Sequence, residues 1–196
     1  EAVTKALALD GSLPEAHGTL AYIMAYYHWN WSGAEEEFQR SLSLNPNDAT
    51  QRHRYSRYLA SVGRVDDALR ELERARLLDP LDPLIRANVG VIHYFARQYD
   101  ETIAGLQDLL KDEPDFSTAH WGLGLAYEQK GSYAQAAAEL EKAAGHRGVN
   151  SLASLGHLYG IMGRKDKARE ILAELEARGK QENISGYQFA IVHLGL

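Results

Sequence analysis

The side chains in this sequence that could bind a metal or transfer a proton are eight histidines and 27 acidic residues. Zinc binding on a helix needs two histidines at H-x-x-x-H or H-E-x-x-H spacing, and the sequence has no such pair. It also has no cysteine, so neither a thiolate metal site nor a disulfide can form. We therefore expect no metal site and no cofactor. We interpret the histidines as helix-packing residues, with His17 and His120 in one column and His93 and His193 in another.

Carboxylates cluster at Glu35-Glu36-Glu37 and at Glu139 with Glu141. Catalytic carboxylates need a shared and partly dry cleft, whereas these lie on predicted helix faces that point to solvent. The sequence contains no nucleophile elbow, no phosphate-cradling glycine loop and no kinase signature. We therefore expect that the chain is not an enzyme and has no catalytic residues.

The composition is that of an ordinary soluble protein, with 45% hydrophobic and 24% charged residues and a net charge of −6. Basic residues alternate with acidic ones, which argues against binding to nucleic acid, RNA included, because phosphates are bound by a basic stripe. No run of about 18 uncharged apolar residues occurs, so we expect no membrane span. The lack of cysteine fits a cytoplasmic location. The sequence starts with neither a methionine nor a signal peptide, and we interpret it as a fragment of a longer protein.

The elements that must position all side chains are helices, and the stretch from Gly63 to Pro80 shows their pattern. The glycine predicts a turn, and Asp66 is expected to cap the amides of the helix that follows. Apolar residues then recur at helical spacing, and Asp79-Pro80 is expected to end the helix because proline disfavours the α conformation of the preceding residue.

This pattern repeats along the chain, with Pro46, Pro80 and Pro114 spaced 34 residues apart. Repeats of this length predict a solenoid of stacked helix pairs. We expect one solenoid domain over residues 1–196. Its predicted parts are the end of a preceding repeat at 1–12, five repeats at 14–47, 48–82, 83–116, 117–148 and 149–182, and the first helix of a further repeat at 183–196.

In the middle of each predicted first helix, a large residue is followed by a small one, which is the arrangement that close helix crossing requires. The pairs are Leu20-Ala21, Tyr55-Ser56, Val89-Gly90, Leu123-Gly124, Leu155-Gly156 and Phe189-Ala190.

These features resemble the tetratricopeptide repeat family, and the stretch from His120 to Ala143 is the closest match. The resemblance covers practically the whole chain. It implies an all-α fold, a right-handed α–α superhelix of antiparallel helix pairs with about five units and half-repeats at both ends. Three features depart from the family pattern: Arg97 in place of the turn glycine, Thr102 in place of alanine, and the link Gly145–Gly148 without proline. We expect them to loosen local packing or to bend the stack without changing the fold. The aromatic run Tyr26–Trp31 also resembles the repeat regions of multidomain bacterial signalling and regulatory proteins.

The resemblance implies that the first helices line a concave groove that binds an extended or helical segment of a partner protein. The function expected is therefore a non-enzymatic interaction scaffold, part of a larger regulatory protein. The residues expected to line the groove are Tyr22, Tyr26, His53, Arg54, Arg57, Asn88, Val91, Tyr94, Trp121, Leu125, Glu128 and His157.

One subtype of the family binds chaperones by clamping a terminal carboxylate with lysine, asparagine and arginine from consecutive first helices. Asn88 matches the asparagine, but Gly18, Tyr22 and Leu84 do not match the other positions, so we do not expect that clamp. An acidic partner segment could still meet the basic patch of Arg54 and Arg57, because guanidinium groups suit carboxylates.

Two questions stay open at the level of sequence. The aromatic run Tyr26–Trp31 could be a wedge between the helices of the first repeat, or Trp29 or Trp31 could stay partly exposed as a contact. The alternative function is self-association through the terminal half-repeats. For that alternative, the last helix is expected to present Phe189, Ile191, Val192 and Leu194 to a missing neighbour.

Overall fold

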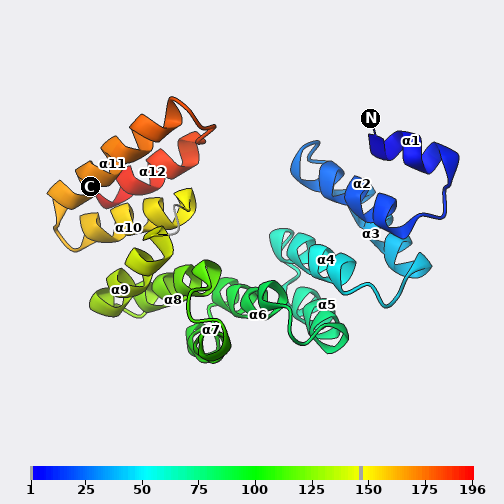
Figure 1. The fold of residues 1–196 in the computed structure, drawn as a ribbon, viewed down its shortest axis with the longest axis horizontal. Coiled ribbons are helices and arrows are strands. Elements are labelled where there is room, and N and C mark those ends of the chain that lie inside the picture. The colour runs from blue at the N-terminus through cyan, green and yellow to red at the C-terminus, as the bar shows by residue number, and fades with distance from the viewer. Residues whose placement is uncertain (1, 146–147) are drawn as a thin grey trace. The chain divides into compact units, whose positions relative to one another are not determined.

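In the computed structural model, which describes residues 2–145 and 148–196, the described chain is entirely α-helical and contains no strand, as predicted (Figure 1). No helix in these ranges is both long and apolar enough to cross a membrane. The helices are α1 (Ala2–Leu9), α2 (Pro14–Tyr26), α3 (Trp31–Leu44), α4 (Ala49–Ser61), α5 (Val65–Leu78), α6 (Pro83–Phe95), α7 (Tyr99–Asp112), α8 (Ser117–Gln129), α9 (Tyr133–Gly145), α10 (Val149–Ile161), α11 (Lys165–Gly179) and α12 (Gly186–Gly195).

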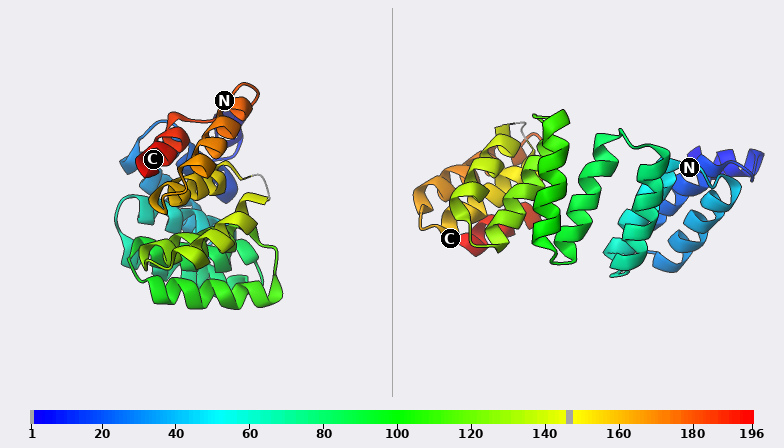
Figure 2. Two further views of the ribbon diagram at one scale, coloured as in Figure 1. Left: turned by 90° about the vertical axis from the view of Figure 1, so that its left-hand side faces the viewer. Right: turned by 90° about the horizontal axis from the view of Figure 1, so that it is seen from below.

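The helices form two compact units, unit 1 over Glu1–Phe95 and unit 2 over Ala96–Leu196. Within each unit, consecutive helices pack side by side, as in the pairs α2–α3, α4–α5 and α8–α9 (Figure 2). The division of the chain into one domain with the repeat boundaries given above stays a prediction. The end of its fourth repeat and the link Gly145–Gly148 include residues 146–147, which lie outside the described residues.

Small and large residues alternate in the core of unit 1. Phe38, Leu59 and Leu72 are buried to 1% exposure or less, and their rings and branches fill the space beside alanines such as Ala21 and Ala68. The Phe38 ring lies 5.4 Å from the ring of Tyr55 and 5.5 Å from that of Tyr58, which joins α3 to α4. Aromatic pairs at these distances add to the stabilisation that area burial provides.

In unit 2 the small residues in the middle of α8 and α10 are the glycines Gly124 and Gly156. A Cβ atom on Gly124 of α8 would come within 2.5 Å of Leu140 on α9, so the two helices cross at the distance that a large-small pair permits. The contact between α10 and α12 is closer still, because a Cβ atom on Gly160 would come within 2.3 Å of the backbone of Gly195.

The turns between paired helices need one residue in the left-handed conformation, and glycine is the residue that adopts it without strain. Gly63, Gly131 and Gly163 take this role, with φ values of 81°, 73° and 75°. Arg97 has the same conformation, with φ of 60°, at the position where glycine is replaced. The turn geometry is therefore kept at Arg97, at the energetic cost of a side chain in that region.

The prediction that Asp66 caps the helix after Gly63 is wrong. The N-cap residue of α5 is Arg64, which makes no side-chain cap hydrogen bond, and Asp66 is the second helical residue. An aspartate at this position stabilises the helix through its dipole and not as a cap. Side-chain caps do occur at α3 and α4, where Asn30 accepts from the amide of Gly33 at 3.1 Å and Asp48 accepts from that of Gln51 at 2.9 Å.

Candidate functional site

The predicted groove residues lie on first helices in both units, and we treat the two sets separately. The first-helix face of unit 1 consists of Tyr22, Tyr26, His53, Arg54, Arg57, Asn88, Val91 and Tyr94 on α2, α4 and α6. The first-helix face of unit 2 consists of Trp121, Leu125, Glu128 and His157 on α8 and α10.

The aromatic residues of the unit 1 face lie mainly on α2. The rings of Tyr22 and Tyr26 pack at 4.7 Å with a tilt of 45°, and both side chains are half-buried. The Tyr26 hydroxyl lies 3.2 Å from that of Ser61, which connects α2 to α4. At the other end of the face, the ring of Tyr94 packs edge-on against that of Phe95 at 5.6 Å.

Two guanidinium groups on α4 make no hydrogen bond or ion pair with the described residues. They belong to Arg54, which is half-buried, and to Arg57, which is exposed. The neighbouring Arg52 shows the contrast, since it donates to Glu71 and to the carbonyl of Pro46. The charges of Arg54 and Arg57 are therefore available to a partner.

His53 directly precedes Arg54 on α4 and is only 6% exposed. Its Nε2 has no hydrogen-bond partner in the described part of the chain. Burial lowers the pKa of His53, the charge of Arg57 lowers it further, and Asp82 and Asn88 oppose this shift. His53 is therefore neutral at pH 7 and adds no third positive charge to the arginine pair.

Asn88 and Val91, the remaining residues of the unit 1 face, offer no free polar group of the kind that the sequence predicted at Asn88. The Asn88 side chain donates to the carbonyl of Leu84 at 2.7 Å, on its own helix, and Val91 is half-buried. The side-chain amide that matches the chaperone-binding pattern is thus engaged within α6.

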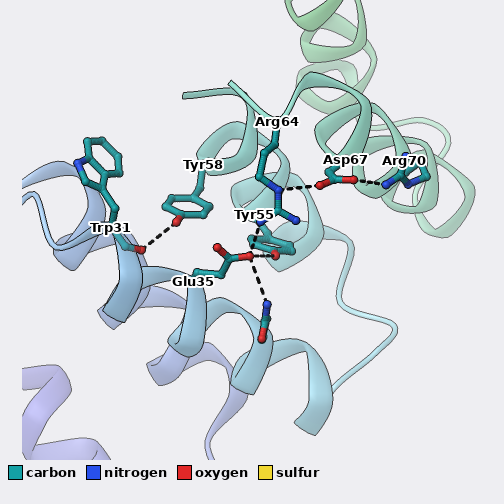
Figure 3. A network of polar contacts seen from close by, with 8 residues as sticks. Trp31, Glu35, Tyr55, Tyr58, Arg64, Asp67 and Arg70 are labelled. Atoms are coloured by element: carbon teal, nitrogen blue, oxygen red, sulfur yellow. Dashed lines mark hydrogen bonds and ion pairs between the residues drawn. The ribbon is translucent and has the colours of Figure 1, made fainter. Parts of the chain in front are cut away.

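A network of polar and charged side chains connects the second helices of unit 1 with α4 (Figure 3). Glu35 accepts from Arg64 at 2.5 Å and from the Tyr55 hydroxyl at 3.1 Å, and Arg64 also donates to Asp67 at 2.7 Å. Arg70 pairs with the same Asp67. This network joins α3, α4 and α5, whereas the exposed Arg40 on α3 makes no ion pair within the described residues.

The first-helix face of unit 2 brings two predicted residues together. The Glu128 carboxylate on α8 lies 3.5 Å from the His157 Nε2 on α10, and His157 Nδ1 donates to the carbonyl of Ile191 at 3.1 Å. Burial raises the pKa of Glu128, an effect that the charge of His157 opposes, and its Oε2 has no partner among the described residues. These side chains join α8, α10 and α12, and Leu125 beside them is half-buried.

Trp121 is the wall of a cavity of about 330 Å³ between the first turns of α8 and α10. Its indole N–H donates to the hydroxyl of Ser154 at 3.1 Å, so the ring is held in place. Sequence reasoning identified only Trp121 here. The other lining residues are Ser117, Thr118, Gly148, Val149, Asn150 and Ser151.

The histidine columns have different outcomes. His17 contacts Glu37 at 2.6 Å and the carbonyl of Gly11 at 3.0 Å, and His120 contacts Glu139 at 2.5 Å and the carbonyl of Pro114 at 2.8 Å. The prediction of inter-helix packing is confirmed for this column. His193 is exposed, so the prediction is wrong there, because α12 meets α10 through its opposite side. Within residues 2–145 and 148–196, no cluster of three or more acidic or histidine side chains could hold a metal ion.

The two tryptophans of the aromatic run at the α2–α3 turn have different surroundings. Trp31 packs on Tyr58 of α4 at 6.2 Å, and the Tyr58 hydroxyl donates to the carbonyl of Trp31 at 2.8 Å, so these contacts join α3 to the next repeat, and the predicted wedge between the helices of the first repeat stays a prediction. Trp29 is 68% exposed, has a left-handed φ of 55° and packs edge-on against Trp31 at 5.6 Å. Trp29 is therefore a surface aromatic residue.

Comparison with known proteins agrees with this architecture. Two family models described as tetratricopeptide repeat match residues 92–148 and 149–175. No curated protein sequence matches the chain significantly.

Several solved structures share the fold. A thermophilic tetratricopeptide repeat protein from Thermus thermophilus aligns with a TM-score of 0.79 and 21% identity, over 93% of this chain and 98% of that one. PilW, a widely conserved type IV pilus biogenesis factor, aligns with a TM-score of 0.75 and 23% identity, over 97% of this chain and 87% of that one. YrrB, a repeat protein with an unusual peptide-binding site, aligns with a TM-score of 0.58 and 16% identity, over 88% of this chain and 90% of that one.

At these identities the likeness bears on the fold, and it confirms the predicted α–α superhelix class. The two family matches identify tetratricopeptide repeats over residues 92–175 of the chain.

Proposed function

We propose that the chain is a non-enzymatic protein-interaction scaffold that binds a partner segment on its first helices. The observation that carries the proposal is the difference between helices in unit 1. Arg54 and Arg57 on α4 have no partner in the described residues, whereas the arginines at the start of α5 and along it, Arg64, Arg70, Arg74 and Arg76, are ion-paired. Unpaired guanidinium groups beside the Tyr22–Tyr26 ring pair suit a partner with carboxylates and apolar side chains.

Two further considerations support a binding role. The tetratricopeptide fold is typically a scaffold without catalytic activity, and YrrB shows that a similar structure can carry a peptide-binding site. Membership in a larger regulatory protein and a cytoplasmic location stay predictions, based on the resemblance of Tyr26–Trp31 and on the composition.

An array of short peptides of varied sequence tests the proposal. The wild-type chain is expected to bind a subset enriched in Asp and Glu. The double variant Arg54→Glu, Arg57→Glu is expected to lose that subset by roughly tenfold or more, because it replaces two attractive charges by repulsive ones.

A matched control reverses two exposed arginines on second helices, Arg40 and Arg74. This control changes the net charge equally and is expected to keep the wild-type binding pattern. The proposal fails if the wild-type chain binds no peptide, or if the Arg54, Arg57 variant and the control bind alike.

Self-association is the second candidate, and the last helix gives it a specific basis. Tyr187 is 67% exposed and Leu194 is 80% exposed on α12. The expected set of four exposed residues needs correction, because Val192 is fully buried and Phe189 and Ile191 are half-buried against the rest of unit 2. Light scattering over a range of concentrations tests this candidate, and a strict monomer at all concentrations would contradict it.

A further inference from the structure

The ring of His17 connects three segments of unit 1. His17 is the fourth residue of α2. Its Nδ1 lies 2.6 Å from the Glu37 carboxylate on α3, and its Nε2 lies 3.0 Å from the carbonyl oxygen of Gly11, six residues earlier in the loop before α2. One side chain thus joins a loop, a first helix and a second helix.

The same arrangement occurs in unit 2. His120 is the fourth residue of α8. Its Nδ1 lies 2.5 Å from the Glu139 carboxylate on α9, and its Nε2 lies 2.8 Å from the carbonyl oxygen of Pro114, which again stands six residues earlier in the preceding loop. The two histidines therefore occupy equivalent positions and have equivalent partners.

A third helix pair has an arginine at this position. Arg52 is the fourth residue of α4, and its Nε donates to the carbonyl of Pro46, six residues earlier, at 2.9 Å. Its Nη1 pairs with Glu71 on α5, which follows Arg52 by 19 residues, as Glu139 follows His120. Because the arginine guanidinium stays protonated in proteins, these partners form a site for a cation.

Packing alone does not require a charge at these positions. In the pair α10–α11, the fourth residue of the first helix is Leu152, and Ile171 follows it by 19 residues. Both side chains are buried. An apolar pair can thus replace the charged one within the same fold, as is common for buried ion pairs.

Both ring nitrogens of His17 and of His120 face acceptors. A carbonyl oxygen can only accept, so Nε2 must carry a proton. If the ring were neutral, the lone pair of Nδ1 would then point at an ionised carboxylate, which is also only an acceptor. The arrangement is satisfied when each histidine–glutamate pair holds one further proton, and the ring holds it because imidazole is a stronger base than a carboxylate.

The charged groups around His17 agree with this reading. α3 presents Glu37 and Arg40 to the ring, α1 contains one charged residue, Lys5, and α4 meets the next residue of α2 through the neutral Gln51. Burial lowers the pKa of His17, the hydrogen bonds to Glu37 and to the loop carbonyl raise it, Arg40 opposes them, and the net pKa is raised. The stabilisation is therefore present below pH 6.5, the ordinary value, and is lost as pH rises through the folded pKa.

The charged groups at His120 lie on α9. Glu139 contacts the ring with one carboxylate oxygen, and its other oxygen accepts from Lys142 at 2.9 Å. The other helices that pack on α8 bring charged side chains to its far end, in the pairs Asp100–Lys130 and His157–Glu128.

We propose that the His17–Glu37 and His120–Glu139 pairs are pH-sensitive links between helices, each closed while its ring carries two protons. When the second proton is lost, Nε2 keeps the loop carbonyl, but Nδ1 becomes an acceptor that faces a carboxylate. The first helix then loses its link to the second helix. The Arg52–Glu71 pair has the same partners and stays closed at every pH near neutrality. The inference does not depend on partner binding.

Hydrogen–deuterium exchange of the whole chain at about pH 6 and about pH 8.5, corrected for the intrinsic pH dependence of exchange, tests the proposal. Protection in α2, α3, α8 and α9 is expected to fall roughly tenfold at the higher pH relative to α4 and α5, because a hydrogen bond to a charged group is lost. Nitrogen NMR of the rings is expected to show two protonated nitrogens in His17 and His120 at the lower pH and a proton on Nε2 alone at the higher pH.

Two variants of nearly unchanged shape separate the links from other pH effects. In Glu37→Gln and Glu139→Gln, the new side-chain amide can donate to the Nδ1 of a neutral ring. We expect these variants to fold, and the pH-dependent loss of protection is expected to disappear at the substituted helix pair.

Glu71→Gln is the matched control, because Glu71 also accepts from an arginine three residues later, as Glu139 accepts from Lys142. It is expected to lower protection in α4 and α5 by the same factor at both pH values, since Arg52 stays charged.

Four results would overturn the inference. They are unchanged protection of α2–α3 and α8–α9 between the two pH values, an equal loss in α4–α5, persistence of the loss in Glu37→Gln and Glu139→Gln, and an unprotonated Nδ1 in both rings at the lower pH.

Discussion

The two units use the same type of helix pair and carry different chemistry on their first helices. In unit 1 the face has two unpaired guanidinium groups on the same helix as a buried, neutral His53. In unit 2 the Glu128 carboxylate lies beside the His157 ring, and the open feature is a cavity whose described lining residues carry no charged side chain. Packing of the helix pair thus determines the buried residues, whereas the surface residues of the first helices differ between the two units and give them different binding properties.

The largest effect of a substitution on packing is expected at Leu140, which is fully buried against Gly124. Leu140→Ala is expected to lower the free energy of unfolding of unit 2 by about 3 kcal/mol, through lost burial and the cavity left behind. Urea denaturation measures the change. Leu77→Ala on α5 is the control, because Leu77 is 71% exposed, and it is expected to change stability by less than about 0.5 kcal/mol. Equal effects of the two substitutions would contradict the assigned core.

The next largest loss of stability is expected from a substitution at the contact between α10 and α12. Gly160→Ala places a Cβ atom within 2.3 Å of the Gly195 backbone, so the helices must move apart. We expect a loss of about 1–3 kcal/mol. Gly105→Ala is the control, because a Cβ atom on that glycine of α7 meets nothing within 4 Å and alanine has the higher helix propensity. A Gly160→Ala variant as stable as the wild type would mean that α12 does not pack closely on α10.

These contacts show what the sequence could and could not predict. The proline spacing and the large-small pairs were sufficient for the helices and for crossings such as Leu123-Gly124 over Leu140. They could not predict the Glu128–His157 pair or the Trp121 cavity, because both depend on the spacing between successive first helices. A shift of a few ångströms between two helices changes neither column of residues, yet it decides whether side chains from them touch.

The stability of the fold is expected to depend on pH through Glu128. Its pKa is raised by burial, so the folded state favours the protonated carboxyl group. The stabilisation is present below the unfolded pKa and is lost as pH rises through the folded pKa. Glu128→Gln keeps the neutral form at all pH values, and its stability relative to the wild type is therefore expected to increase from pH 4 to pH 7. Thermal unfolding at several pH values measures this, and a constant difference would contradict the raised pKa.

A smaller pH effect is expected from His17 in unit 1. Burial lowers its pKa, but the hydrogen bonds to Glu37 and Gly11 outweigh burial, and the net pKa is raised. The stabilisation is present below the unfolded pKa near 6.5 and is lost as pH rises through the folded pKa. Replacement of His17 by Gln is expected to remove this decline between about pH 6 and 8. If the decline is the same in the variant, another group is responsible.

The central claim is that a partner binds to the first helices and not to the second helices. Hydrogen–deuterium exchange of the chain, with and without the tightest peptide from the array, tests it most directly. We expect slower exchange in α2, α4 and α6, or in α8 and α10, with little change in α3, α5, α9 and α11. Protection confined to α3, α5, α9 or α11 would contradict the claim.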